Sequence, residues 1–143
     1  MKLITKYLTL AGIGLCILIL FATCKTIRPG TTNKSISTSA EDFDEFYTKF
    51  HSDSLFQMSR IKFPLNGKSI DANGEKMWTM QNWELMRTRI FDVDTTEYKI
   101  TYKKYPKQFT QKAWLEDSGF SSECKFELIN KKWFLVYVLD HNL

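Results

Sequence analysis

Two histidines, each close to an aspartate, are the residues of this sequence best suited to acid–base chemistry. His51 lies two positions before Asp53, and His141 directly follows Asp140. A carboxylate can orient an imidazole so that the ring acts as a general base. Both pairs fall where helices or strands are expected to end. We therefore interpret both pairs as solvated and expect catalysis at neither.

Cys124 and Arg60 also stand out by their surroundings. Cys124 alternates in register with Phe126 and Leu128. This pattern predicts a buried structural cysteine rather than a nucleophile, because a reactive thiol needs a polar and partly exposed setting. Arg60 lies between apolar neighbours in an expected strand. We expect its side chain to point to solvent beside Lys62, not into a pocket where it would hold an anion.

Motifs for the common cofactors and nucleophiles are absent from the sequence. There is no Cys-x-x-Cys, His-Glu-x-x-His, phosphate-loop or Gly-x-Ser-x-Gly pattern. Residues 92–95 (DVDT) are like the opening of a calcium loop, but Lys103 occupies the twelfth position, where Glu is needed. We expect a turn at 92–95, no metal, no cofactor and no enzymatic activity.

Length, composition and charge limit the class of protein. The chain has 143 residues, of which 43% are hydrophobic and 25% charged, and this fits one globular domain. The net charge of +4 falls to +2 without Lys2 and Lys6. The remaining basic residues are interleaved with acidic ones, whereas nucleic-acid binding needs a concentrated basic patch. We therefore expect no nucleic-acid partner.

The N-terminus has the outline of a secretory leader. Lys2 and Lys6 precede a run of 17 uncharged residues, 7–23, which is the order of a basic region and an apolar region in a signal peptide. Seventeen helical residues span about 25 Å, less than the ~30 Å of a hydrocarbon core. Length favours a leader, with a short uncleaved anchor as the alternative.

The residues that follow this run, Phe21-Ala22-Thr23-Cys24, resemble the bacterial lipobox. Phe21 and Thr23 depart from the usual Leu and Gly, Ala or Ser but keep the size pattern. The resemblance implies a lipoprotein signal peptide at 1–23 and a lipid on the sulfur of Cys24, which would anchor the protein to a membrane of the cell envelope. Lys25, in place of an Asp that retains some lipoproteins at the inner membrane, favours the outer membrane. The alternative is an ordinary cysteine near the end of an anchor helix.

The mature chain divides into a tether and a domain. Residues 25–39 are rich in Ser and Thr, a composition that buries too little apolar surface to fold. We expect 24–40 to be a flexible tether and 41–143 to be a single α+β domain.

Helical and strand periods predict the first elements of the domain. Aromatic residues at 43, 46, 47 and 50 share one face of a helix that begins at Glu41. A helical turn at 52–58, capped by Ser52 or Asp53, follows it. Residues 59–63 alternate as a strand that Pro64 and Asn66-Gly67 would end, and the good helix formers at 77–86 predict another helix.

The second half of the chain predicts strands. Residues 98–103, 109–116 and 120–128 alternate between apolar and polar types, while 133–139 is apolar on both faces and should be a central strand. Asn130-Lys131 predicts a tight turn. The order of elements predicts an α+β fold in which helices pack on a strongly bent antiparallel sheet.

Four segments of the domain resemble a known family. They are residues 43–50, residues 56–65, the Trp78 and Trp83 pair, and residues 126–135. The family comprises uncharacterised lipid-anchored proteins of gut-type bacteria with a fold like nuclear transport factor two (NTF2), also called cystatin-like. The resemblance implies a cone-like domain with a pocket at its open end. Superfamily members include isomerases, dehydratases and non-enzymatic binding modules, so the fold settles no activity.

The aromatic content, 15% with four Trp, leaves rings available for ligands. We expect a non-catalytic binding module whose cone offers Tyr98, Tyr102 or Trp114 to a small ligand, a glycan or a partner protein of the envelope. The alternatives are a small isomerase- or hydrolase-like enzyme with an acid–base residue in the cone, and a pocketless structural envelope protein. An ionisable side chain in the pocket with a shifted pKa would favour the enzyme. The oligomeric state stays open.

Overall fold

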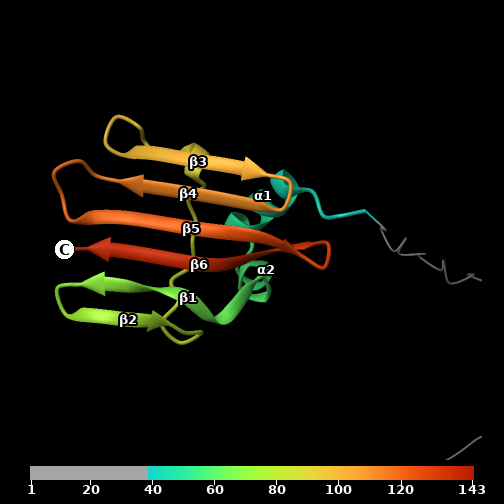
Figure 1. Cartoon of the computed structure of the whole chain (residues 1–143), viewed down its shortest axis with the longest axis horizontal. Helices are drawn as coiled ribbons and strands as arrows, with labels where there is room; N and C mark the ends of the chain where they lie inside the picture. The colour runs from blue at the N-terminus through green and yellow to red at the C-terminus, as the bar shows by residue number, and fades with distance from the viewer. Residues whose placement is uncertain (1–38) are drawn as a thin grey trace, which may run out of the picture. The chain divides into compact units, whose positions relative to one another are not determined.

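A computed structural model describes residues 39–143 of the chain. This part contains two α-helices, a short 3₁₀-helix and six strands (Figure 1). The elements in chain order are α1 (Phe43–Ser52), α2 (Ser54–Ser59), β1 (Ile61–Asp71), β2 (Gly74–Trp78), η1 (Ile90–Asp92), β3 (Lys99–Tyr105), β4 (Gln108–Trp114), β5 (Phe120–Ile129) and β6 (Lys132–Asn142).

The six strands form one open sheet in the order β2-β1-β6-β5-β4-β3. All neighbours are antiparallel except β1 and β6, which are parallel. The predicted α+β class and the central place of the last strand are confirmed. The sheet is mixed and not purely antiparallel as predicted, because β1 lies between its hairpin partner β2 and the last strand β6, to which it is parallel.

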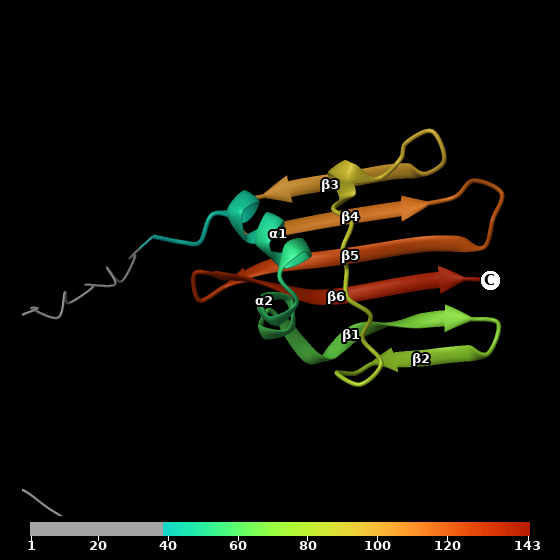
Figure 2. The ribbon, with the colours of Figure 1, turned by 180° about the vertical axis from the view of Figure 1, so that it is seen from behind.

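Both helices cover the same end of one face of the sheet (Figure 2). The connection between β2 and β3, residues 79–98, crosses that face from one edge of the sheet to the other, and we call it the strap. Beyond the strap, the rest of the face carries no helix (Figure 2). The sheet therefore has a helix-covered end and an open end.

Aromatic rings fill the helix-covered end. The face of α1 packs on Phe109 and Phe126 of the sheet, and each of these two rings is fully buried. The predicted aromatic stripe of α1 is thus core, and Asp42 caps the helix by accepting from the amides of Asp44 and Glu45 at 2.9 Å. Asp53 caps α2, as one of the two predicted caps.

The prediction that Pro64 and Gly67 end the first strand is wrong. β1 continues to Asp71, and its pairing with β6 shifts register between Ile61 and Asn66. Pro64 lies at this irregularity, where the ladder does not need its missing N–H. Gly67 has a φ of 93°, and a Cβ there would collide with the carbonyl oxygen of Val138. Glycine therefore permits the close approach of β1 to β6.

The predicted helix at 77–86 is also wrong. Met77 and Trp78 end β2, and the strap then runs without regular structure to η1. Trp78 pairs across the ladder with Leu65 and donates from its indole nitrogen to the Val138 carbonyl at 2.9 Å. These long-range bonds replace the helical hydrogen bonds that the local sequence favours.

The predicted turn at Asn130-Lys131 is confirmed by its backbone angles. Both residues have positive φ, 49° and 66°, as a two-residue hairpin loop requires. The turn also contacts the first residues of the domain, because the Lys131 carbonyl accepts a hydrogen bond from the Glu41 amide at 2.9 Å.

The predicted leader at 1–23, the lipid attachment at Cys24 and nearly all of the predicted tether lie outside the described residues. Within residues 39–143, no helix has the length and apolar character needed to cross a membrane.

Candidate functional site

The open end of the helix-bearing face is hollowed into a cavity of about 640 Å³. Strand pairing places three polar side chains on its floor, because Ser69 of β1 is in register with Asp140 of β6, and Asp140 is in register with Ser122 of β5. Ser122 and Asp140 lie two positions from the buried residues Cys124 and Val138, so they share the face of the core, and Ser69 lines the same cavity. We call this cavity the polar groove. Its lining residues are Ser69, Asp71, Lys76, Trp78, Gln81, Asn82, Trp83, Glu84, Phe120, Ser122, Asp140, His141 and Asn142.

Asp140 is the ionisable group on the groove floor. Its carboxylate accepts a hydrogen bond of 2.5 Å from the hydroxyl of Ser122. Burial raises the pKa of Asp140 above its usual value, and the negative charge of Glu84 adds to the rise, while the Ser122 bond and the charge of His141 oppose it. Asp140 therefore keeps its proton to a higher pH than an exposed aspartate does.

Two tryptophans wall the groove on the side of β2 and the strap. The rings of Trp78 and Trp83 meet edge to face, 5.5 Å apart at 74°. The Trp78 indole nitrogen donates a hydrogen bond to the Val138 carbonyl of β6, and the Trp83 indole nitrogen donates to the side-chain oxygen of Gln57 at 3.2 Å. Both indole N–H groups are thus engaged with the protein, which fixes the rings. Trp78 is only 8% exposed, so the partly exposed Trp83 offers the ring surface for a ligand.

Gln57 of α2 holds the strap in place. Its side chain is fully buried, and its amide nitrogen donates to the carbonyls of Phe50 and Met86 at 2.7 and 2.8 Å. Its amide oxygen accepts from the Met86 amide at 2.9 Å as well as from Trp83. One buried side chain therefore positions a wall of the groove.

A smaller and more apolar pocket of about 340 Å³ adjoins the polar groove. Phe120 borders both cavities, and its ring meets Tyr98 edge to face at 5.8 Å. Val93 and Ala113 complete the apolar wall, and the strap supplies three polar residues at the margin. The polar groove and the apolar pocket therefore lie side by side, with Phe120 between them.

The structure separates the three aromatic residues predicted to bind a ligand. Tyr98 lines the apolar pocket. Tyr102 lies on the same face but packs on Phe91 and Phe109, on the helix side of the strap. Trp114 lies on the opposite face of the sheet, because neighbouring residues of a strand point to opposite faces and its neighbour Ala113 points to the core side. No single site contains all three.

The prediction that His51 is solvated is wrong. His51 is 4% exposed, and its Nδ1 is bonded to the Tyr47 carbonyl at 2.8 Å. Its Nε2 has no hydrogen-bond partner among residues 39–143. Burial lowers the pKa of the imidazole, so the ring is neutral in the core. The other histidine of the sequence, His141, borders the polar groove beside Asp140.

The predicted burial of Cys124 is confirmed. Its side chain is 2% exposed and lies between β4 and β6. Burial raises the pKa of the thiol far above its usual value, so the nucleophilic thiolate is not formed at neutral pH.

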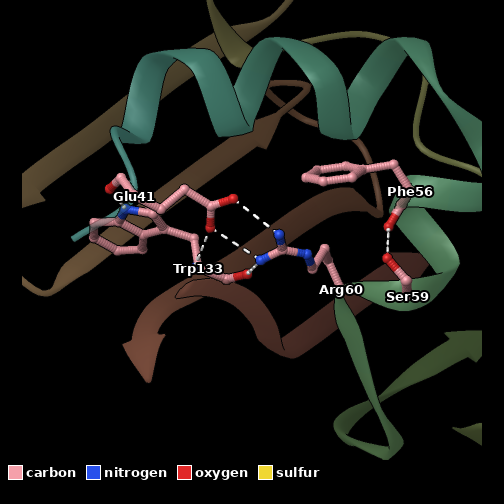
Figure 3. A network of polar contacts seen from close by, with 5 residues as sticks. All are labelled: Glu41, Phe56, Ser59, Arg60 and Trp133. Carbon is pink, nitrogen blue, oxygen red and sulfur yellow. Dashed lines mark hydrogen bonds and ion pairs between the residues drawn. The ribbon is translucent and has the colours of Figure 1, made fainter. Parts of the chain in front are cut away.

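The prediction that Arg60 points to solvent is wrong. Its guanidinium donates two hydrogen bonds of 2.9 Å to the Glu41 carboxylate (Figure 3) and lies over the Phe56 ring at 4.6 Å. Glu41 also accepts from the Trp133 amide at 2.8 Å, and its carbonyl accepts from the Trp133 indole at 3.0 Å. This network, which we call the Glu41 clasp, fastens the first residues of the domain to β6 at the helix-covered end.

Sequence reasoning missed the groove floor. The sequence pattern pairs Asp140 only with His141 and assigns no functional role to Ser69 or Ser122. The signal was present, because Ser122 and Asp140 continue the alternation of the buried residues Cys124 and Val138. Within the part of the chain that the structure describes, no group of three or more His, Cys, Asp or Glu side chains is arranged to hold a metal ion.

The chain is similar to several solved structures of Bacteroides proteins. A cystatin-like protein from Bacteroides caccae is 28% identical over 71% of this chain and 77% of its own, with a TM-score of 0.53. A protein from Bacteroides uniformis is also 28% identical, over 73% and 78%, with a TM-score of 0.53. An NTF2-like protein from Bacteroides fragilis is 19% identical over 73% and 48%, with a TM-score of 0.49.

Comparison with curated proteins finds no match. A protein-family model matches residues 41–142, which is most of the chain and nearly all of its described part. The chain therefore belongs to the family of that model, and its fold is similar to that of the cystatin-like protein from Bacteroides caccae.

Proposed function

We propose that this protein is a non-catalytic binding module of the cell envelope that holds a hydroxyl-rich ligand, a glycan unit, in the polar groove. The observation that carries the proposal is the Asp140–Ser122 pair on the floor of a cavity of about 640 Å³. Carboxylate oxygens accept from adjacent sugar hydroxyls, and the serine and amide groups can donate to or accept from others. A concave site with a few convergent polar groups and aromatic walls is typical of ligand pockets.

The aromatic walls support a sugar as the ligand. Trp83 and Phe120 border the groove on two sides of Asp140, and flat rings offer apolar surface to the C–H faces of a pyranose while the polar floor takes its hydroxyls. The amide side chains of Gln81 and Asn82 lie on the strap at the rim. The groove therefore matches the two-sided chemistry of a carbohydrate.

Binding is tested with the full-length chain in detergent on an array of neutral and acidic glycans, followed by calorimetry with any glycan that binds. We expect Asp140→Asn and Trp83→Leu each to weaken binding by about tenfold or more, because each removes a central contact. Glu97→Gln, an exposed carboxylate outside the groove, is the matched control and should leave binding unchanged. Capture of no glycan, or equal binding by Asp140→Asn, contradicts the proposal.

One observation favours an enzymatic alternative. Burial raises the pKa of Asp140, which is the direction that a general acid requires. In that case the captured glycan would be cleaved or isomerised by the wild-type chain, with activity that falls as the pH rises and Asp140 loses its proton, and Asp140→Asn would lose this activity. An unchanged glycan after prolonged incubation supports the binding module instead.

We further propose that a lipid on Cys24 anchors the protein to the outer membrane, with residues 24–40 as the tether. The Glu41 clasp fixes the start of the domain at the helix-covered end, whereas the C-terminus lies at the other end (Figure 2). Asp140 is near the C-terminal end of β6. The tether would then join the domain at the end opposite the groove and leave the groove open to a ligand.

Anchoring is tested by growing cells with globomycin, which blocks the lipoprotein signal peptidase, and determining the mass of the N-terminus. We expect a diacylated mature chain that begins at Cys24 without the drug and an uncleaved, lipidated precursor with it. An unlipidated chain that begins at another residue contradicts the proposal.

A further inference from the structure

The face of the sheet opposite the helices carries a second cavity. Figure 1 shows this face toward the viewer, with no helix in front of it. Lys112 and Trp114 of β4 point to it, because they alternate with the core-side residues Gln111 and Ala113. Together with Ser121 and His141 they line a cavity of about 390 Å³ at the open end of the sheet.

The position of the Lys112 ammonium group is unusual for a surface lysine. Lys112 is half-buried and directly opposite Glu123 in the ladder, which is the arrangement that favours a cross-strand ion pair. Yet no ion pair joins Lys112 to any carboxylate among residues 39–143. Its ammonium lies over the Trp114 ring instead, 5.9 Å from the centroid. The cation is thus turned into the cavity without a counter-ion.

The other residues that line the cavity are suited to an anion beside Lys112. Thr101 and Ser121 add hydroxyl donors, and Leu115 adds apolar surface beside the Trp114 indole. No Asp or Glu of the described residues lines the cavity. A half-buried cation that forms no ion pair attracts anions, and a flat indole face prefers a flat apolar partner.

We propose that this cavity is a binding site for a small aromatic carboxylate, whose carboxylate pairs with Lys112 and whose ring stacks on Trp114. The site lies on the other face of the sheet from the polar groove, and it goes beyond the function proposed for the groove. The hydroxyls of Thr101 and Ser121 can donate to the second carboxylate oxygen.

The test uses benzoate as the probe, with the full-length chain in detergent and the indole N–H signal of Trp114 as the readout. Trp114→Phe assigns that signal among the four tryptophans. We expect benzoate to shift it saturably, and benzamide, which has the ring without the charge, to bind about tenfold more weakly or worse. Acetate, which has the charge without the ring, should also bind at least about tenfold more weakly.

Two lysine variants separate a site from general attraction to a basic surface. Lys112→Gln should weaken benzoate binding about tenfold or more. Lys103→Gln removes an exposed lysine of β3 on the same face, outside this cavity, and should change binding less than about twofold. Equal effects of the two variants, equal binding of benzamide, or no saturable shift overturns the proposal.

Asp140→Asn keeps this test independent of the glycan proposal. That variant alters the polar groove and not the Lys112 cavity, whose lining excludes Asp140. We expect it to bind benzoate as the wild type does. A loss of benzoate binding in Asp140→Asn would mean that the probe occupies the polar groove, and this too would overturn the second site.

Discussion

Replacing Gln57 by Leu is expected to lower the free energy of unfolding by about 3–5 kcal/mol and to release the strap from the helix-covered end. Leu has nearly the volume of Gln but no polar atom. The four partners of Gln57 are the carbonyls of Phe50 and Met86, the Met86 amide and the Trp83 indole N–H. Each loses its hydrogen bond in the variant.

The size of this effect follows from burial. Gln57 is fully buried, so water does not replace the lost bonds unless the strap moves. Each unsatisfied buried group costs about 1–3 kcal/mol, and partial movement of the strap relieves some of that cost. The strap carries Trp83, so the same variant should also remove one wall of the polar groove and weaken ligand binding there.

Urea unfolding and amide hydrogen exchange measure the two parts of this expectation. The unfolding midpoint of Gln57→Leu should fall, and the Met86 amide should lose most of its protection. Gln81→Leu is the matched control, because Gln81 is exposed on the same strap, and it should change stability by less than about 0.5 kcal/mol. A loss below about 1 kcal/mol for Gln57→Leu, with Met86 still protected, would contradict the assigned role.

The strap also explains where sequence reasoning succeeded and failed. The sequence predicts the strands at 98–103, 109–116 and 120–128 from their period of two and the strand at 133–139 from its apolar run, and each pairs with a sequence neighbour. The segment 77–86 has good helix formers, but its backbone bonds go to β1 and to Gln57. Contacts so distant in sequence outweigh local propensity and leave no local pattern.

The candidate site was harder to predict than the fold. The floor residues Ser69, Ser122 and Asp140 come from three strands, and the parallel pairing of β1 with β6 brings Ser69 to the other two. A sequence shows which residues alternate within a strand, but it does not show this register. The same limit affects Tyr98 and Trp114. Trp114 pairs with Lys99, the residue after Tyr98, so it faces away from Tyr98.

Replacing Glu41 by Ala is the second change with a large expected effect, a loss of about 2–4 kcal/mol in the free energy of unfolding. Its carboxylate accepts from the Arg60 guanidinium twice and from the Trp133 amide once. Arg60 and Glu41 side chains are only 13% and 23% exposed, so the arginine would remain partly buried without its counter-charge. The clasp joins the start of the domain to β6, and its loss should fray both.

A double-mutant cycle with Arg60→Met isolates the pair from the rest of the clasp. Met keeps part of the packing of Arg60 on the Phe56 ring but has no charge. If the two side chains act as a pair, the double variant loses less stability than the two single variants added together, by about 1–2 kcal/mol. Additive losses within about 0.3 kcal/mol would show that Glu41 acts through the Trp133 amide alone. Because the clasp lies at the opposite end from Asp140, neither variant should change ligand affinity at the polar groove while the domain stays folded.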